Sequence, residues 1–141
     1  MRDLNEWVEN FGEIKTGTGG CNCVAWNPAF DEQVMIIVGC TSQLPSIQSD
    51  ESLLLLYRLD GSEKKGVFKP YGDGDFVGHT SSINDVAWAP LAGRSFHLIV
   101  SSSADKSIIV WKMQTRDLFD PSGAMFEKPK VEKIFFMKPN A

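Results

Sequence analysis

The sequence predicts an all-β fold built from two similar units, because one segment recurs at a fixed distance and each unit divides into short apolar runs. Residues 22–28, Asn-Cys-Val-Ala-Trp-Asn-Pro, return as residues 84–90, Asn-Asp-Val-Ala-Trp-Ala-Pro, with five of seven positions identical. The shift from Trp26 to Trp88 is 62 residues. A fixed shift between similar segments is the signature of a repeat architecture.

Each unit divides into four short strands bounded by turn residues, and no stretch has helical periodicity long enough to compete. Both Trp-x-Pro segments end a strand, since proline lacks a ladder donor and pushes the preceding residue out of the helical region. Four strands per unit form the blade of a β-propeller. The expected strands cover residues 21–26, 34–40, 52–59 and 66–70 in the first unit, and 83–88, 98–101, 107–113 and 131–137 in the second.

The third strand of each unit is a nearly continuous apolar run, residues 53–57 and 108–111. Such a run indicates burial on both faces, as between neighbouring blades; periodicity alone also fits a short buried helix, but the β-branched content favours a strand. The second strands keep the shift of 62, which places residues 37–38 on residues 99–100, whereas Tyr57 matches Trp111 at a shift of 54. We assign the difference to the loop 41–51.

We therefore expect residues 1–141 to form a partial propeller. Residues 4–17 would be the outer strand of a preceding blade, residues 18–77 a degenerate first blade and residues 78–141 the second blade. Propellers need about four to eight blades. The ring would thus be completed in a longer chain, of which this is a fragment or partial gene model, or by association, and both end surfaces should expose apolar side chains.

The second unit resembles one complete WD-repeat signature: Gly78-His79, then a strand, then residues 101–107, Ser-Ser-Ser-Ala-Asp-Lys-Ser, and then residues 108–111, Ile-Ile-Val-Trp. The fold class that follows is an all-β, WD-repeat β-propeller fragment. In that family a His, a Ser or Thr, an Asp and a Trp form a hydrogen-bonded structural tetrad. The resemblance assigns the tetrad here to His79, Ser101, Asp105 and Trp111. The first unit has Gly19-Gly20 and Tyr57-Arg58 at the matching places, so its tetrad is absent or degenerate.

The same Ser, His and Asp could be taken for a hydrolase triad. Their order and spacing suit a repeat unit, and the chain has no Gly-x-Ser-x-Gly elbow. We therefore expect no catalytic residue, and a protein that is not an enzyme.

Two motifs could suggest a metal site, and we expect neither to hold one. Cys21 and Cys23 alternate across a strand, and the other candidates, Cys40, His79 and His97, are distant in the sequence. Residues 72–75, Gly-Asp-Gly-Asp, lack the further ligands of a calcium loop. Three cysteines in a chain that starts without a secretion signal indicate reduced thiols rather than a disulfide framework, and no cofactor is implied.

The composition excludes some partners. The formal charge is -4 and the 14 Lys and Arg residues are scattered, which disfavours direct nucleic-acid binding. No apolar run approaches the roughly 20 residues of a membrane helix, and residues 1–7 lack a signal-peptide core. These features indicate a protein of the cytosol or nucleus with no membrane insertion.

A finer resemblance rests on residues 83–90, Ile-Asn-Asp-Val-Ala-Trp-Ala-Pro, followed by residues 93–97, Gly-Arg-Ser-Phe-His. With residues 4–7 and 21–28 upstream, they resemble the scaffold nucleoporins called Sec-thirteen homologues. The resemblance implies a non-catalytic scaffold of the Y-shaped nuclear pore complex, at the nuclear envelope, acting in protein and mRNA transport. Its implied partner is an α-solenoid nucleoporin, bound by blade or strand addition. The family also serves in a nutrient-sensing complex at the lysosomal or vacuolar surface.

Departures from that family keep two alternatives open. Gly78-His79 is closer to a generic WD repeat, which leaves a vesicle-coat subunit or another WD adaptor, and residues 115–130 form an insert without a match. A peptide-reading adaptor would use arginines, for which Arg58, Arg94 and Arg116 are candidates. Residues 128–138, with four lysines, are either a basic contact face or an outer strand with charged ends, and we favour the strand.

Overall fold

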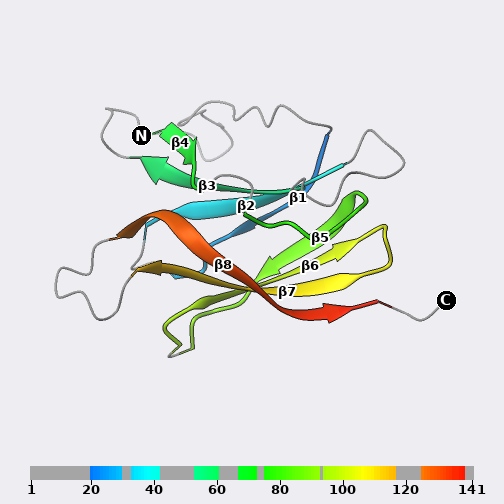
Figure 1. Ribbon diagram of the computed structural model, residues 1–141. Helices are drawn as coiled ribbons and strands as arrows, with labels where there is room; N and C mark the ends of the chain where they lie inside the picture. Colours follow the sequence, from blue (N-terminus) through cyan, green and yellow to red (C-terminus); the bar gives the residue numbers. More distant parts are fainter. Residues whose placement is uncertain are drawn as a thin grey trace, which may run out of the picture.

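A computed structural model describes residues 20–29, 33–41, 53–60, 67–72, 75–92, 94–116 and 125–138. These residues form eight strands in two four-stranded antiparallel sheets, which lie face to face (Figure 1). The described part of the chain contains no helix, and therefore none long and apolar enough to cross a membrane.

The first sheet has the order β1-β2-β3-β4, so that each strand pairs with its neighbours in sequence. Its strands are β1 (Cys21–Trp26), β2 (Met35–Cys40), β3 (Leu54–Asp60) and β4 (Val67–Pro70). All four lie where the sequence predicts them, to within two residues at each end. The short buried helix that periodicity also allowed is not formed, because residues 54–60 pair along their length as β3.

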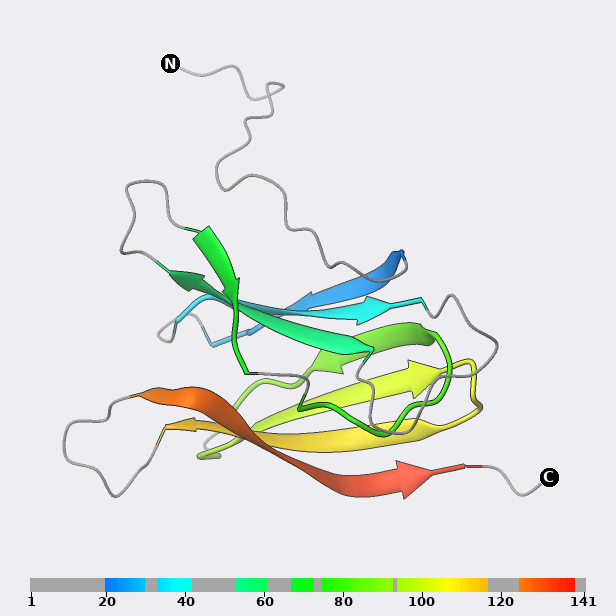
Figure 2. The ribbon, with the colours of Figure 1, turned by 45° about the horizontal axis from the view of Figure 1, so that its top comes forward.

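The second sheet repeats this order as β5-β6-β7-β8 (Figure 2). Its strands are β5 (Ile83–Trp88), β6 (His97–Ser103), β7 (Ile108–Arg116) and β8 (Met125–Met137). Here the predicted insert 115–130 is wrong in part, since β7 extends to Arg116 and β8 begins at Met125. β8 contains Pro129, but within the described residues it pairs only with β7, and an edge strand tolerates a proline.

The ladders define which residues of the two sheets are equivalent. Trp26 pairs with Ile36 and Trp88 with Ile99, so Ile36 rather than Ile37 takes the place of Ile99, and the predicted alignment of the second strands is wrong by one residue. The reason is that the connection from β5 to β6 is one residue longer (99 − 88 = 11, against 36 − 26 = 10). The predicted match of Tyr57 with Trp111 is confirmed, since each pairs with that equivalent isoleucine.

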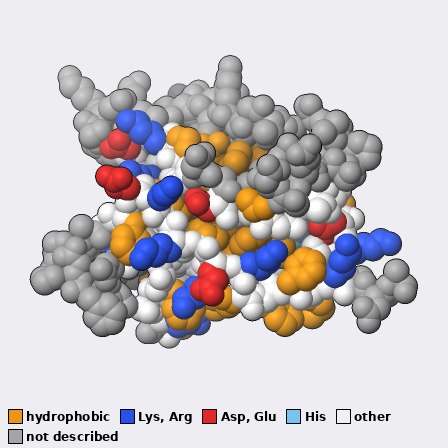
Figure 3. All heavy atoms as spheres, in the orientation of Figure 1, with side chains coloured by type: hydrophobic (Ala, Val, Ile, Leu, Met, Phe, Trp, Pro, Cys, Tyr) orange, Lys and Arg blue, Asp and Glu red, His pale blue; other side chains and the backbone are white. Residues whose placement is uncertain are grey.

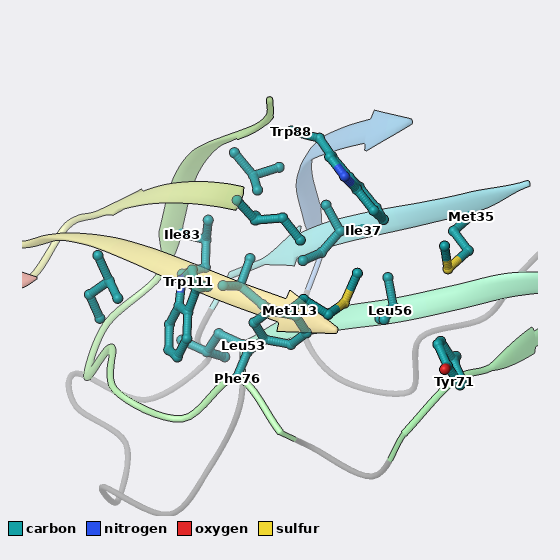
Figure 4. Packing of buried hydrophobic residues seen from close by; sticks show 14 residues of the cluster. Met35, Ile37, Leu53, Leu56, Tyr71, Phe76, Ile83, Trp88, Trp111 and Met113 are labelled. Carbon is teal, nitrogen blue, oxygen red and sulfur yellow. The ribbon is translucent and has the colours of Figure 1, made fainter. Parts of the chain in front are cut away.

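The main core lies between the sheets and is built from apolar side chains of both (Figure 4). The sheets approach closely at Gly39 of β2, where an added Cβ would lie 2.6 Å from Cγ2 of Ile83. Glycine is therefore required there for β5 to pack. The buried members of this core are Met35, Ile37, Leu53, Leu54, Leu56, Tyr71, Phe76, Ile83, Val86, Trp88, Ile99, Ile109, Trp111 and Met113.

The fold class is confirmed: the chain is all-β, with two successive four-stranded antiparallel sheets arranged like neighbouring blades of a propeller. The expected outer strand at residues 4–17 lies outside the described residues. The unit boundaries 18–77 and 78–141 stay predictions, within which the described strands cover residues 21–70 and 83–137.

Candidate functional site

The structure brings together the four residues that the sequence singled out. His79 lies before β5 and reaches Ser101 of β6, with 2.7 Å between Nε2 and Oγ. The indole Nε1–H of Trp111, on β7, donates to the same Oγ at 2.8 Å. On its other side His79 Nδ1 lies 3.3 Å from Oδ2 of Asp105, in the turn between β6 and β7. A series of hydrogen bonds thus links the segment before β5, strand β6, strand β7 and the turn between β6 and β7.

Donors and acceptors in this hydrogen-bond network can be assigned in one consistent way. An indole N–H can only donate, so the Ser101 oxygen accepts from Trp111, and the Ser101 hydroxyl then donates to Nε2 of His79. His79 is therefore the tautomer with its proton on Nδ1, which faces an acceptor in Asp105. With this assignment, each buried donor of the network has an acceptor.

A fifth residue, Ser107, joins the network and was missed by the sequence analysis. Its hydroxyl lies 2.9 Å from His79 Nδ1 and also contacts Oδ1 of Asp105. The signal was available, because Ser107 follows Asp105 by two residues, the spacing at which an Asp side chain caps its own turn. Its backbone amide does donate to Asp105 Oδ1 at 2.8 Å.

The pKa values of both ionisable residues of the network, His79 and Asp105, are lowered. Burial lowers the pKa of His79, although Asp105 opposes this effect, so the imidazole is neutral. Burial alone would raise the pKa of Asp105, but hydrogen bonds from the Ser107 hydroxyl and from the amides of Thr80 and Ser107 lower it to about 2. The network at neutral pH is thus a carboxylate beside a neutral imidazole.

Gly78 allows this arrangement to fit. A Cβ at that position would lie 2.9 Å from Cδ1 of Ile109 and 3.4 Å from Cη2 of Trp111. The Gly-His pair therefore has a packing reason, since a larger residue would push the strand segment away from β7.

The buried position of Ser101 decides between a triad and a structural network. Its side chain is fully enclosed, and its oxygen already bonds both His79 and Trp111. A nucleophile must reach a substrate atom, which this hydroxyl cannot do. The arrangement ties strands together rather than providing a reactive group.

The first sheet has no such network at the equivalent positions. By register, Val38 takes the place of Ser101 and Tyr57 the place of Trp111. Val38 and Tyr57 belong to a second, apolar cluster on the side of the first sheet that faces away from the second sheet.

The metal candidates do not converge among the residues that the structure describes, where no group of three His, Cys, Asp or Glu side chains could hold an ion. Cys21 and Cys40 are opposite each other on β1 and β2, and burial raises the pKa of the Cys23 thiol. His97 instead accepts a hydrogen bond at Nδ1 from Trp88 Nε1, at 3.1 Å. In the segment 72–75, Asp73 and Gly74 lie outside the described residues.

Two of the three candidate arginines have aromatic contacts. The Arg58 guanidinium lies 4.9 Å from the ring centre of Tyr71, and that of Arg94 lies 5.9 Å from the ring centre of Phe96. Arg116 is exposed at the end of β7. They come from three separate elements.

Each sheet has two sides that we name by their place in the repeat. The first sheet turns its following face toward the second sheet, and the second sheet turns its preceding face toward the first. The opposite side of the first sheet is its preceding face, and the opposite side of the second sheet is its following face. By register, the preceding face of the first sheet carries Val24, Trp26, Ile36 and Tyr57. The following face of the second sheet carries Ala87, Leu98, Val100, Ile108 and Val110.

These outer faces expose apolar side chains. Val24 and Trp26 are 59% and 61% exposed on the first sheet, and Val100 and Ile108 are 37% and 40% exposed on the second. Hydrophobic side chains also gather at the C-terminal end of β8, where residues 134–137 are about half exposed (Figure 3).

Comparison with known proteins identifies the second unit. The family profile described as "WD domain, G-beta repeat" matches residues 73–112, a segment that contains all four residues of the network. Residues 73–112 form a WD repeat. The second sheet thus corresponds to one blade, and the first sheet keeps its strand order while it lacks the polar network.

The chain is also similar to nucleoporins. It is 27% identical over 118 residues to Nucleoporin SEH1-B of Xenopus laevis, an alignment covering 81% of this chain and 31% of that protein. It is 29% identical over 93 residues to Nucleoporin seh1 of Schizosaccharomyces pombe, covering 66% of this chain and 23% of that protein. With Nucleoporin SEH1 of Homo sapiens it shares 26% identity over 106 residues, covering 73% and 27%. The chain therefore spans less than a third of the length of these relatives.

Proposed function

We propose that this WD-repeat chain acts as a non-catalytic scaffold nucleoporin of the nuclear pore Y complex, in nucleocytoplasmic transport at the nuclear envelope. The observation that carries the proposal is the similarity to SEH1 nucleoporins, which extends over 81% of the chain. An interaction scaffold agrees with the geometry, because the one cluster of Ser, His and Asp among the described residues is enclosed.

The partner we propose is an α-solenoid nucleoporin that adds a blade or a strand. Two features support addition of a sheet: apolar side chains on both outer faces, and a long strand, β8, that pairs on one side only in the part of the chain described. Strand or blade addition takes its affinity from main-chain hydrogen bonds and its specificity from alternate side chains.

Affinity capture of the tagged chain from cells, followed by mass spectrometry, tests this proposal. We expect α-solenoid nucleoporins to be enriched over an Ile108→Lys variant, which places a charge on the following face of the second sheet, where Ile108 is 40% exposed. A control is Lys128→Ala, at an exposed position on β8.

The identity of the captured proteins discriminates the alternatives. Vesicle-coat subunits would replace the nucleoporin assignment by a coat subunit, and lysosomal or vacuolar signalling proteins would place the chain in a nutrient-sensing complex instead. Capture that is lost on Arg94→Ala or Arg116→Ala, and kept by Ile108→Lys, would favour a peptide-reading adaptor.

A further inference from the structure

The contact between the two sheets joins a following face to a preceding face. The other sheet in each case has an equivalent face on the outside of the described structure. Inside, the following face of the first sheet packs on the preceding face of the second. Outside, the preceding face of the first sheet and the following face of the second have no partner sheet among the described residues. A second copy of the chain would therefore offer each outer face the type of surface that its inner equivalent already binds.

The residues of the outer preceding face repeat those of the inner one. Val24 is equivalent to Val86 and Trp26 to Trp88, and both pairs are identical residues. Val86 and Trp88 are buried against the first sheet, whereas Val24 and Trp26 are exposed. The remaining equivalent pairs are Ile36 with Ile99 and Tyr57 with Trp111.

The outer following face also carries apolar residues, beside the charged Asp85 and Lys112. The inner surface, formed by Met35, Ile37, Leu54 and Leu56, corresponds by register to Leu98, Val100, Ile108 and Val110. In the core between the sheets Trp88 and Ile37 belong to one buried cluster. Trp26 of one copy would therefore meet Val100 of the next.

On each outer face, the exposed residues that could form such a contact lie on or next to the first strand of the sheet, β1 or β5. Ile36 and Tyr57 are 8% and 6% exposed and already covered within the chain. Val24 and Trp26 on β1 are exposed, as are Ala87 on β5 and Val100 on β6. The contact would thus place β1 of one copy beside β5 of another, as β1 lies beside β5 within the chain.

Two local details of the inner contact have matching equivalents. Inside, Gly39 leaves room for Ile83. Outside, the equivalent residues are Ser102, which is larger than Gly39, and Cys21, which is smaller than Ile83, so the change in size on one face offsets that on the other. Inside, Asn22 Nδ2 donates to the Ile83 carbonyl at 2.8 Å. Its equivalent, Asn84, is exposed and would reach the Cys21 carbonyl of the next copy.

We propose that the chain associates with itself head to tail, with the following face of the second sheet of one copy on the preceding face of the first sheet of the next. A contact between two different faces closes into a ring when the rotation per copy allows it. The proposal goes beyond the scaffold function, and a second copy would compete with the proposed nucleoporin for the following face of the second sheet. The mass of the purified chain tests self-association, and capture from cells tests the nucleoporin.

Native mass spectrometry and light scattering of the purified 141-residue chain test the proposal first. We expect a particle that contains at least two chains of 15.7 kDa each. Trp26→Lys and Val100→Lys, one on each face, should each reduce the mass to that of one chain. Ile134→Lys, at an equally exposed position on outer strand β8, should leave the assembly intact.

Mixing the two variants separates a head-to-tail contact from a symmetric one. Each variant keeps the face that the other has lost, so an equimolar mixture should form a dimer of one copy of each and nothing larger. In a symmetric contact, one of the two variants would still associate with itself. Far-UV circular dichroism checks folding, and Val24→Lys with Ala87→Lys provides a second pair if either variant unfolds.

The proposal is overturned by a wild-type chain that stays monomeric at high micromolar concentration, or by a mixture of folded variants that stays monomeric. It is also overturned if Ile134→Lys dissociates the particle as fully as Val100→Lys does, because non-specific apolar contact would then explain the association.

Discussion

The two sheets share strand order, register and the Trp that ends the first strand, yet they are stabilised differently. In the second sheet a chain of hydrogen bonds links His79, Ser101, Asp105 and Trp111. In the first sheet the position of Ser101 holds Val38, within an apolar cluster. The four-stranded topology therefore does not require the network. What the network adds is a polar tie between the turn, the strand β7 and the segment before β5.

The same comparison holds for the environment of identical residues. Trp26 and Trp88 occupy equivalent positions, but Trp88 is 8% exposed and donates to His97, whereas Trp26 is 61% exposed and contacts Phe68. The difference arises from neighbours and not from local sequence, because among the described residues only Trp88 has a sheet packed on its side.

The largest effect that separates the two sheets is expected for the two tryptophans. Trp88→Ala should lower the free energy of unfolding by about 4 kcal/mol, because it removes a buried indole and leaves a cavity between the sheets. Trp26→Ala should change it by about 0.5 kcal/mol at most, as surface substitutions do. Urea unfolding of the two variants in dilute solution measures both values.

Equal losses for the two variants would contradict this comparison, since they would mean that Trp26 is buried in solution. A loss at Trp26 that grows with protein concentration would instead point to association through β1, because Trp26 lies on the outer preceding face.

The next effect tests the network itself by giving the second sheet the residue of the first. Ser101→Val should cost about 3 kcal/mol, because the Trp111 N–H and His79 Nε2 would each lose a buried partner. Ser101→Thr is the matched control and should cost clearly less, since it keeps the hydroxyl. Thermal and urea unfolding would measure both variants, and similar losses for the two would show that packing and not hydrogen bonding determines the stability at this position.

Much of this fold could be predicted from the sequence because the repeat is written in local patterns. The Trp-x-Pro segments and the apolar runs placed all eight strands. The one-residue shift between Ile36 and Ile37 could not be found, since a single extra residue in the connection to β6 leaves both apolar patterns intact. The start of β8 at Met125 could not be predicted either, because a strand can include Pro129 only where it is an edge strand.

For the site, the four residues of the network were found by resemblance and the fifth was not. Ser107 was passed over because serine is common in turns, and only the short approach to His79 Nδ1 shows that it takes part. The division of the apolar residues between the two faces of each sheet was also beyond the sequence, because it depends on register, which decides the face to which each residue points.

Acid should weaken the second sheet in a way that the first sheet cannot show. The pKa of Asp105 is lowered to about 2 in the folded chain. Its stabilising contribution is therefore present above the ordinary Asp value near 3.9 and is lost as the pH falls from about 4 to about 2. The loss should be about 2 kcal/mol. His79 adds to it, because its lowered pKa means that the unfolded chain takes up a proton first as the pH falls below about 6.5.

Asp105→Asn separates this effect from general acid unfolding. The free energy of unfolding, measured from pH 7 to pH 2, should lose its step between about pH 4 and pH 2 relative to the wild type. Glu132→Gln, an exposed carboxylate on β8, should retain the step. A step of unchanged size in Asp105→Asn would show that the carboxylate does not stabilise the folded network.

The smallest effect concerns the turn that carries Asp105 between β6 and β7. Lys106 has a φ of 69°, in the left-handed region that side chains with a Cβ adopt at a cost. Lys106→Gly should therefore stabilise the chain by about 0.5 kcal/mol, the relief of strain exceeding the added entropy of the unfolded chain. Ala104→Gly, in the same turn without a positive φ, should destabilise it by a similar amount. If both glycines destabilise, the turn is held by Asp105 and its hydrogen bonds to Thr80 and Ser107, and the backbone of Lys106 carries no strain that glycine could release.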